Sequence, residues 1–401
     1  MAAGPAAAAP LSRAVAAPAR VTAISPGRRA VRWLTPGAAA TAPGARPMTA
    51  AKAAVTPATA VLYGASCTSR TACTAVGVIT TSNGKYARTL AERWNGSKWA
   101  VQPTPTPLSG GLAGGLLGGV ACTSPTACVA AGYSYNKTRA ALLGESWNGR
   151  KWVTQPSATP VPGGLASGIS CTWRNDCTAS GLRSGGGTLA EHWNGRKWSA
   201  EATQRRGVLA GVSCPASKNC TAVGEVITGK ALAEHWNGKA WSLQSARSPA
   251  QIDQLSSVSC HPAGDCMAVG SAGSSTAAAP LAEQWTGSAW GLLAAVDPVP
   301  GDTAEFNSVS CLSVTNCTAV GDAMNAASTT DATLVERWDG TAWTVETSPS
   351  PGKFSALTSV SCTSATFCVA VGGRALSASS AASPLVETWN GATWSVQAAP
   401  R

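Results

Sequence analysis

The sequence predicts an all-β protein, a seven-bladed β-propeller of four-stranded antiparallel blades. Three observations predict this fold. A pattern with a period of about 49 residues occurs seven times between Leu62 and Gln397, each copy holds a Cys-x5-Cys pair, and each ends in a Trp-x4-Trp pair, mostly written Trp-Asn-Gly-x-x-Trp. All 14 cysteines and 14 of the 16 tryptophans belong to this pattern. Because a fixed period of this length is the signature of repeat architectures, it decides the fold before any single residue does.

Repeat 7 shows the four expected strands in order. The first strand, residues 357–362, and the second, residues 368–372, carry small or apolar side chains on both faces, so both faces need covering. The third strand, residues 385–389, and the fourth, residues 394–397, carry the bulky side chains. Asn390-Gly391 lies between the third and fourth strands and is a strong signal for a tight hairpin turn.

Small side chains on the first strands and indoles on the last strands fit a wedge-shaped sheet. The inner strands of such a sheet are crowded around an axis, and the outer strands fill a widening gap. Seven wedges would close a ring. A β-solenoid is the competing repeat fold, but it stacks shorter coils in parallel and does not use repeated Asn-Gly hairpins. Eight-bladed and sandwich arrangements are further alternatives.

Repeat 7 also carries a family resemblance. Its Cys-Val-Ala-Val-Gly-Gly run at 368–373, its Glu-Thr-Trp-Asn-Gly run at 387–391, Trp394 and Pro400 resemble a kelch-type blade, as in the central domain of galactose oxidase. The pattern also resembles secreted Ser-Cys/Trp-Asn-Gly propeller repeats of actinobacteria, whose roles are largely uncharacterised. Most repeats depart from kelch in having a single Gly, a Trp in place of Tyr, and the cysteine pair. The resemblance covers residues 60–400 and implies a fold, since such propellers serve enzymes and binding scaffolds alike.

The cysteine pairs predict seven disulfides, each joining two neighbouring strands within one repeat. Each bridge closes a loop of seven residues and stabilises the fold by about 2 kcal/mol in the chain-entropy account. Reduced core thiols and zinc are the alternatives, but the spacing is wide for zinc and the chain has only three His. Disulfides imply an exported, oxidised protein. The expected pairs are Cys67–Cys73, Cys122–Cys128, Cys171–Cys177, Cys214–Cys220, Cys260–Cys266, Cys311–Cys317 and Cys362–Cys368.

The N-terminal region differs from the repeats. We expect residues 1–50 to be a disordered, Ala- and Pro-rich segment with a possible degraded export signal, and residues 51–401 to form the propeller. Seven of the 30 basic residues and none of the 19 acidic ones lie within residues 1–60, so the repeats carry a net charge of only +4. Without a basic stripe on the repeats, nucleic acid is not an expected partner. The sequence contains no run of 18 apolar residues, so no membrane span is predicted.

Chemistry is expected where the repeats differ. The turns between strands one and two and between strands three and four are uniform, whereas the loops between strands two and three vary in length. Function on a rigid scaffold usually lies on such variable loops. Repeats 1 and 2 gather three of the four Tyr there, and aromatic rings with amides and cations can bind a sugar or a peptide. The predicted ligand-binding residues are Tyr86, Tyr133, Tyr135, Asn136, Lys137 and Arg139. Ordinary loop residues are the alternative interpretation.

Two acidic patterns invite a catalytic interpretation. Repeats 5 and 6 place five carboxylates on the variable-loop side, which could bind a cation or supply an acid and a base, although solvated loop charges have the same pattern. These are Asp297, Asp302, Glu305, Asp322 and Asp331. The second pattern is a Glu two residues before the first Trp of every repeat. Since it alternates with Leu and Trp on one face, we expect it to point between blades and to tether them through hydrogen bonds. These glutamates are Glu92, Glu145, Glu191, Glu234, Glu283, Glu336 and Glu387.

No nucleophile elbow, phosphate loop, metal-binding His pair or sialidase Asp box occurs in the sequence. We therefore predict a secreted or cell-surface bacterial binding protein, a monomer without cofactor, metal or catalytic residues, whose partner is a glycan or an extracellular protein. The alternatives are a carbohydrate-active hydrolase or lyase with an acidic site on the variable-loop side, and a purely structural surface protein.

Overall fold

The computed structural model describes residues 59–80, 87–105, 114–136, 140–156, 163–274, 277–325, 327 and 329–400. The predicted disordered segment at 1–50 lies outside these residues. So do three of the predicted ligand-binding residues, Tyr86, Lys137 and Arg139.

The described residues form 28 β-strands and no helix. Each sequence repeat supplies four consecutive strands, which we call a unit. The strands of a unit follow one another in the chain. Unit 1 holds β1 (Thr59–Ser69), β2 (Ala72–Thr80), β3 (Ala87–Trp94) and β4 (Trp99–Gln102). Unit 2 holds β5 (Gly114–Ser124), β6 (Ala127–Tyr135), β7 (Ala140–Trp147) and β8 (Trp152–Thr154). Unit 3 holds β9 (Leu165–Trp173), β10 (Asp176–Arg183), β11 (Gly187–Trp193) and β12 (Trp198–Glu201). Unit 4 holds β13 (Gly207–Ala216), β14 (Asn219–Val226), β15 (Ala231–Trp236) and β16 (Trp241–Gln244). Unit 5 holds β17 (Ile252–Cys260), β18 (Cys266–Gly273), β19 (Ala278–Trp285) and β20 (Trp290–Leu293). Unit 6 holds β21 (Thr303–Ser313), β22 (Asn316–Met324), β23 (Asp331–Trp338) and β24 (Trp343–Val345). Unit 7 holds β25 (Phe354–Ser364), β26 (Phe367–Ala375), β27 (Ser383–Trp389) and β28 (Trp394–Val396).

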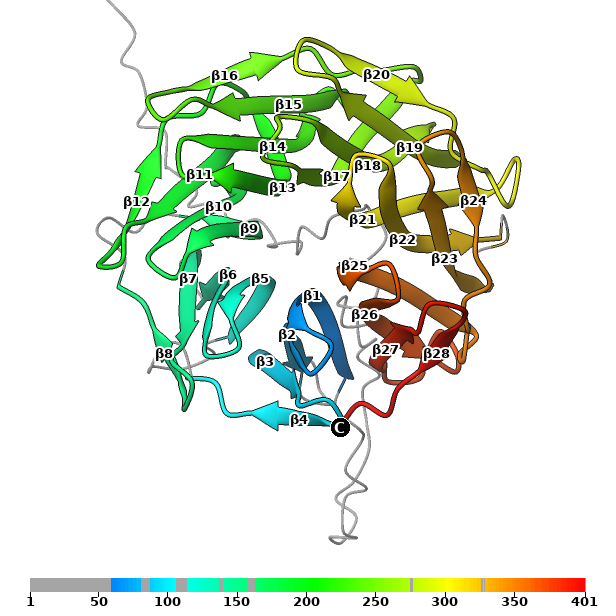
Figure 1. Cartoon of the computed structure of the whole chain (residues 1–401), viewed down its shortest axis with the longest axis horizontal. Helices are drawn as coiled ribbons and strands as arrows, with labels where there is room; N and C mark the ends of the chain where they lie inside the picture. The colour runs from blue at the N-terminus through cyan, green and yellow to red at the C-terminus, as the bar shows by residue number, and fades with distance from the viewer. Residues whose placement is uncertain are drawn as a thin grey trace, which may run out of the picture.

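The predicted antiparallel pairing is confirmed. Units 1 to 4 are separate four-stranded antiparallel sheets, with the first strand at one edge and the fourth at the other. Units 5 to 7 belong to one mixed sheet of twelve strands, because single parallel bridges join Ala278 to Thr303 and Asp331 to Phe354. The sheets stand radially around a common centre, with β1, β5 and the other first strands innermost and β4, β8 and the other fourth strands outermost (Figure 1).

All seven predicted disulfides are present, and no cysteine is free. Each joins the first and second strand of a unit, with Cα atoms 3.9–4.0 Å apart. In unit 1, Cys67 lies directly opposite Cys73, and Cys73 lies opposite Trp94 on the third strand. The strand register therefore brings the disulfide and the first Trp of a unit to the same end of the sheet.

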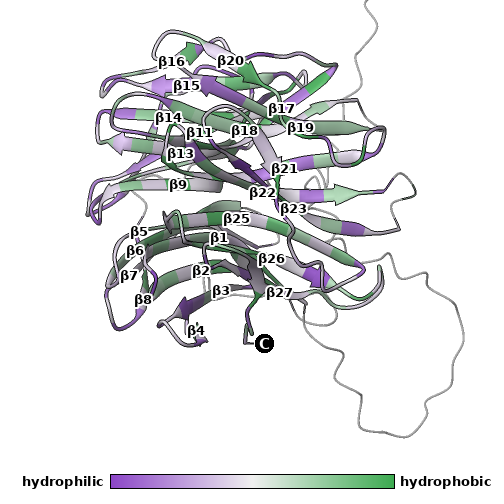
Figure 2. Ribbon diagram, turned by 45° about the vertical axis from the view of Figure 1, so that its right-hand side comes forward, coloured by the Kyte–Doolittle hydropathy of each residue, from purple (hydrophilic) through white to green (hydrophobic). Residues whose placement is uncertain are grey.

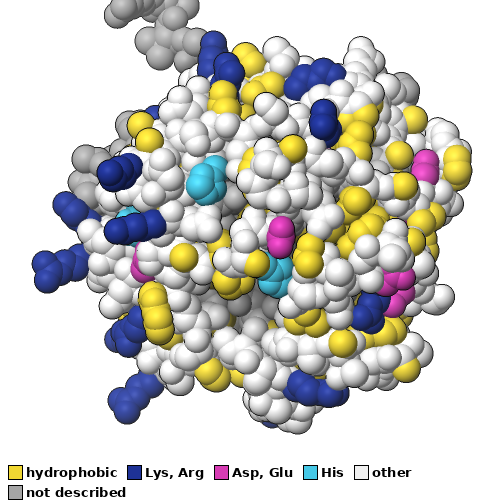
Figure 3. Space-filling model, turned by 45° about the horizontal axis from the view of Figure 1, so that its top comes forward, with side chains coloured by type: hydrophobic (Ala, Val, Ile, Leu, Met, Phe, Trp, Pro, Cys, Tyr) yellow, Lys and Arg dark blue, Asp and Glu magenta, His cyan; other side chains and the backbone are white. Residues whose placement is uncertain are grey.

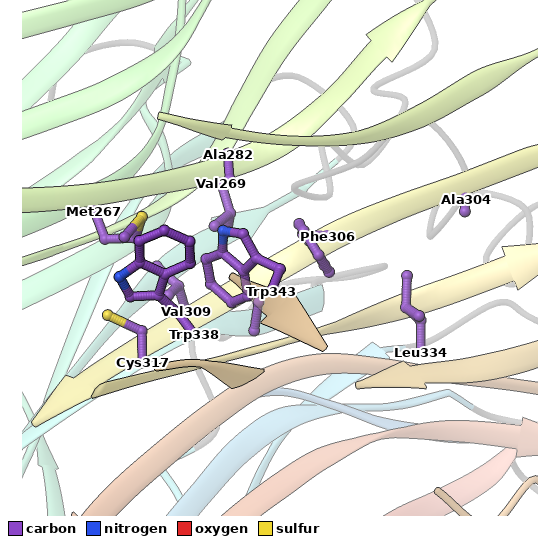
Figure 4. Close-up of a cluster of buried hydrophobic side chains, with 11 residues drawn as sticks. Met267, Val269, Ala282, Ala304, Phe306, Val309, Cys317, Leu334, Trp338 and Trp343 are labelled. Atoms are coloured by element: carbon purple, nitrogen blue, oxygen red, sulfur yellow. The ribbon is translucent and has the colours of Figure 1, made fainter. Parts of the chain in front are cut away.

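The core lies at the seams between neighbouring units. The two Trp of each unit pack at ring distances of 5.7–6.0 Å. At the seam between units 5 and 6, Trp338 and Trp343 lie against Met267, Val269 and Phe306 (Figure 4). Figure 2 shows the corresponding alternation of apolar and polar residues along the strands. Each unit thus buries its bulk against the next one rather than within itself.

A repeated serine hydrogen bond links the innermost strands. The backbone N–H of the first Cys of one unit donates to the hydroxyl of the Ser that precedes the first Cys of the unit before it. The donor–acceptor pairs are Cys122–Ser66, Cys214–Ser170, Cys260–Ser213, Cys311–Ser259, Cys362–Ser310 and Cys67–Ser361, at 2.9–3.1 Å. The missing bond involves Ala121, which stands where the other units have Ser. The last pair joins unit 7 to unit 1, so the hydrogen bonds close the ring without a shared strand.

The outer strands are linked in a related way. The second Trp of a unit donates its indole N–H to the residue three positions after the second Trp of the preceding unit. The donor–acceptor pairs are Trp198–Gln155, Trp241–Glu201, Trp290–Gln244 and Trp394–Glu346, at 2.8–3.2 Å. Leu293 occupies this acceptor position in unit 5, and the Trp343 indole N–H of unit 6 has no partner among the described residues. The Trp99 and Trp152 indoles also have no partner among the described residues, although Gln397 and Gln102 stand at the acceptor position. The bond therefore forms at four of the seven seams.

Candidate functional site

The two ends of the ring differ. At the end that carries the disulfides, which we call the disulfide end, the turns between third and fourth strands repeat one arrangement. In unit 1 the Asn95 side-chain oxygen accepts the backbone N–H groups of Ser97 and Lys98. Gly96 adopts a φ of 95° and a Cβ there would meet Thr71 at 2.8 Å, so this position requires Gly. The opposite end, which we call the loop end, carries the loops between second and third strands and the connections between units.

Three tyrosines gather at the loop end of units 1 and 2. Tyr63 on β1 and Tyr133 on β6 are buried in one apolar cluster with Val61 and Leu116, and Tyr135 packs against this cluster. The rings of Tyr133 and Tyr135 lie 6.1 Å apart. Burial raises the pKa of all three phenols above the ordinary value, so they remain neutral hydrogen-bond donors.

The structure gives the predicted ligand-binding residues different surroundings. Tyr133 is only 4% exposed and is therefore part of the packing at the base of the loops. Tyr135 is half-buried, and Asn136 follows directly after β6 at the loop end. Tyr86, Lys137 and Arg139 lie in the β2–β3 and β6–β7 loops, outside the described residues. Tyr135 and Asn136 are thus the described members of the predicted set that a ligand could reach.

Sequence reasoning missed Tyr63. It stands four residues before the first Cys, where the other units carry small or polar side chains: Gly118, Ser167, Ala210, Ser256, Asn307 and Thr358. Its hydroxyl is buried without a hydrogen-bond partner among the described residues. The contrast between a Tyr in unit 1 and small or polar residues in the other units is the sequence signal that indicates it.

A polar cluster occupies the loop end of units 5 and 6. Glu305 on β21 lies directly opposite Asp322 on β22, and both are nearly inaccessible, at 4% and 5% exposed. The side-chain amide of Asn307 donates to Asp322 at 2.8 Å, and that of Gln254 lies 3.5 Å from Glu305. Asp331 is also buried, whereas Asp297 and Asp302 are partly exposed. The structure therefore brings two of the five predicted carboxylates side by side, and each of the two is buried next to a side-chain amide.

The seven repeated glutamates are all completely buried. Three of them accept a backbone N–H from the connection that leaves the preceding unit. Gln204 donates to Glu234 at 3.3 Å, Arg247 to Glu283 at 2.9 Å, and Val296 to Glu336 at 3.1 Å. In unit 7 the Ser348 hydroxyl donates to Glu387 instead, at 2.7 Å. These four carboxyl groups join consecutive units, whereas both oxygens of Glu191 have no hydrogen-bond partner among the described residues.

Glu92 and Glu145 lack this hydrogen bond because proline stands at the position of the backbone donor. The three backbone donors stand six residues after the second Trp, and the corresponding residues for Glu92 and Glu145 are Pro400 and Pro105, which have no N–H. Neither oxygen of Glu92 has a partner among the described residues, and Glu145 has only the nearby Thr89 hydroxyl, which lowers its pKa against the larger effect of burial. Burial raises the pKa of each to about 8, so both are largely protonated near neutral pH.

A cavity of about 240 Å³ adjoins Glu92 at the junction of units 1 and 7. Arg88, Thr104, Pro105 and Pro400 are among the residues that line it. The cavity coincides with the seam whose backbone donor is missing, and its size suits a single side chain or a few water molecules rather than a large ligand.

The described residues contain no cluster of three or more His, Cys, Asp or Glu side chains that could hold a metal ion. They also contain no helix long and apolar enough to cross a membrane. Figure 3 shows Lys and Arg side chains spread around the rim of one face, with acidic and His side chains between them. Positive charge on this face does not form a stripe.

Comparisons with known proteins show the fold. No protein-family model matches the sequence, and no curated protein matches it. Among solved structures, the chain is similar to YCF48 bound to D1 peptide, at 14% identity and a TM-score of 0.51 over 86% of this chain and 96% of that one.

Two further structures have comparable scores. U3-55K is 12% identical with a TM-score of 0.51, over 78% of this chain and 88% of that one. The GH74 xyloglucanase from Xanthomonas campestris is 12% identical with a TM-score of 0.53, over 84% of this chain and 55% of that one. At these identities the likeness establishes the β-propeller fold alone.

Proposed function

We propose that this protein is an extracellular binding scaffold that recognises a glycan or a protein through the loop end of units 1 and 2. The observation that carries the proposal is the tyrosine group. Tyr63 and Tyr133 form a rigid, buried base, and Tyr135 and Asn136 lie above it where the variable loops begin. Tyr side chains supply large contact areas at low entropic cost, which suits recognition. Tyr86, Lys137 and Arg139 belong to the proposed contact surface.

The finer architecture is part of the same proposal. We infer that the three four-stranded groups of the twelve-stranded sheet are separate blades, because each single parallel bridge joins only one residue pair. The propeller then has seven blades, and the Cys67–Ser361 hydrogen bond closes it. The seven disulfides support an extracellular setting, since such bonds persist in oxidising compartments. A bacterial origin, kelch-type blades and a monomeric state complete the proposal.

The structural neighbours support a binding function in different ways. YCF48 was solved with a bound peptide, which shows that a propeller of this shape can hold one. The GH74 xyloglucanase supports the alternative, a carbohydrate-active enzyme with an acidic site at the loop end. Glu305 and Asp322 are the carboxylates that favour this alternative. A glycosidase needs substrate and water between its two carboxyl groups, however, and both groups here are almost completely covered. Burial therefore favours binding over hydrolysis.

The proposal is tested by screening the protein on a glycan array and on an array of extracellular proteins, and by incubating it with polysaccharides to detect released sugars. We expect saturable binding without hydrolysis, and at least about tenfold weaker binding when Tyr135 and Asn136 are both replaced by Ala. Release of reducing sugars that is lost in Glu305→Gln would instead establish the enzyme. Binding unaffected by the double substitution would contradict the proposed surface.

A further inference from the structure

One exposed indole breaks the regularity of the disulfide end. Trp173 is the last residue of β9, two positions after the first Cys of unit 3, and it is 71% exposed. The residues at the equivalent position in the other units are Ser69, Ser124, Ala216, Pro262, Ser313 and Ser364. Four of the seven units therefore use Ser where unit 3 exposes a large aromatic ring.

The common serine has a structural role that Trp173 gives up. In units 1 and 2, Ser69 and Ser124 accept the backbone N–H of Thr71 and Thr126 within the turn. A Trp side chain cannot accept such a bond, and an exposed indole gains little from burial. The substitution thus removes a turn hydrogen bond without adding core packing. Neither the turn nor the core therefore accounts for a large exposed side chain at this position.

Polar side chains capable of hydrogen bonding adjoin the indole. Asp176 is the cross-strand partner of Trp173, so both side chains emerge on the same face of the hairpin. One Asp176 oxygen lies 2.8 Å from His192 Nε2 on β11, and the other accepts the Thr172 hydroxyl at 2.7 Å. Thr172 also contacts Ser217 in the neighbouring turn of unit 4, at 3.3 Å. Asp176 and His192 are both partly exposed.

Unit 4 has the same scaffold without the indole or the charge. His235 occupies the position of His192 and bonds to Asn219, which replaces Asp176, at 3.0 Å. Ala216 stands in place of Trp173. The combination of an exposed Trp, a carboxylate and an imidazole is therefore confined to unit 3. Burial alone would raise the pKa of Asp176, but hydrogen bonds from Ser217, Thr172 and His192 lower it below the ordinary value. The group is thus an ionised acceptor at neutral pH.

We propose that Trp173, Asp176 and His192 form a carbohydrate-binding site at the disulfide end, distinct from the surface proposed at the loop end. A pyranose ring has a face of C–H groups that packs on an indole, and its hydroxyl groups bond to a carboxylate, an imidazole and the exposed Arg174 guanidinium. The size of the patch also favours a sugar over a protein. Among the described residues of the neighbouring turns, no other large hydrophobic side chain is exposed, whereas protein interfaces surround their aromatic anchors with further covered contacts.

The test is affinity gel electrophoresis of the full chain through a panel of soluble polysaccharides, namely xylan, xyloglucan, galactomannan, mixed-linkage β-glucan and glycol chitin. We expect at least one polysaccharide to retard the protein, and Trp173→Ser to weaken this retardation at least about tenfold. Because Ser is the residue of four other units, this variant keeps the turn, and we expect its melting temperature to stay the same or rise. Asp176→Asn, which copies unit 4, should weaken retardation less.

Two controls distinguish this site from nonspecific stacking on any exposed indole and from binding at the loop end. Adding Ser313→Trp to the Trp173→Ser variant restores an exposed indole in unit 6, which carries Asn316 and Arg337 in place of Asp176 and His192. This double variant should remain unretarded if the carboxylate and imidazole are needed. Tyr135→Ala should be retarded normally, because it lies at the other end of the ring. Absence of retardation by every polysaccharide, or normal retardation of Trp173→Ser, would overturn the proposal.

Discussion

The disulfide end and the loop end of this propeller carry different kinds of information. At the disulfide end every unit repeats the same disulfide, and nearly every unit repeats the same serine hydrogen bond and the same turn. A departure in one unit, such as Trp173, can therefore be recognised by comparison with the other units. At the loop end the loops differ in length and content, and a departure such as Tyr63 lies beside loops that share no common pattern. Positions that the units share maintain the ring, and positions where one unit departs are where recognition is expected.

The largest effect is expected from reducing the disulfides. Each bridge closes a seven-residue loop and contributes about 2 kcal/mol. Reducing all seven therefore removes stabilisation comparable to the whole free energy of unfolding of a typical domain. We predict that the protein unfolds at 37 °C under a strong reductant, observed as loss of the far-ultraviolet circular dichroism signal. A folded, fully reduced protein with 14 titratable thiols would show that the disulfide end does not depend on its bridges.

Truncating the buried tyrosine should have the next largest effect. Tyr133→Ala removes a buried aromatic ring from the cluster at the loop end, and we expect a loss of about 3–4 kcal/mol in the free energy of unfolding. Tyr135→Ala is the matched control, because Tyr135 is half-buried on the same strand, and we expect it to cost about 1 kcal/mol. Urea denaturation measures both. Equal costs for the two variants would remove the distinction between a structural base and an accessible contact.

The seam glutamates predict an unusual pH dependence. Burial raises the pKa of Glu283, Glu336 and Glu387 to about 7 and that of Glu92 to about 8, above the unfolded value of 4.5. Their stabilising contribution is therefore complete below pH 4.5 and is lost as the pH rises through 7 to 8. We expect the melting temperature to fall between pH 5 and pH 9.

Glu92→Gln should reduce this dependence, because the amide cannot ionise, and should stabilise the protein at pH 9 by roughly 1–3 kcal/mol. Glu283→Gln is the matched variant at a seam with a backbone donor, since Arg247 already donates to that carboxyl group. Its benefit at high pH should be smaller. A melting temperature that rises steadily from pH 5 to pH 9 would contradict this account of the seams.

The smallest predicted effect repairs a departure. Leu293→Gln supplies the amide acceptor that Gln244 offers to the next indole, and Trp343 is the indole whose acceptor position holds an apolar side chain. We expect a gain of about 1 kcal/mol, measured by urea denaturation. Leu293→Ala serves as the control and should bring no gain. Destabilisation by Gln would mean that the Leu side chain contributes packing that outweighs the hydrogen bond.

The repeat made much of the fold predictable. Strand order, the Asn-Gly turns and the Cys67–Cys73 type of pairing follow from local spacing, because each depends on residues within one unit. The hydrogen bonds between units, such as Cys122 to Ser66, were not predictable, since they depend on how neighbouring strands stack. The burial of Tyr133 had the same origin. Sequence alternation placed it near a loop, but the neighbouring Tyr63 and Leu116 cover it.

Affinity of matched variants at the two ends of unit 2 tests the central claim most directly. At the loop end the Tyr135→Ala, Asn136→Ala double variant removes predicted contacts, and at the disulfide end Ser124→Ala removes a shared turn hydrogen bond. Biolayer interferometry against the partner identified on the arrays gives both dissociation constants. The account predicts at least about tenfold weaker binding for the loop-end variant and unchanged binding for Ser124→Ala. Unchanged binding of the loop-end variant, or loss of binding in Ser124→Ala, would contradict it.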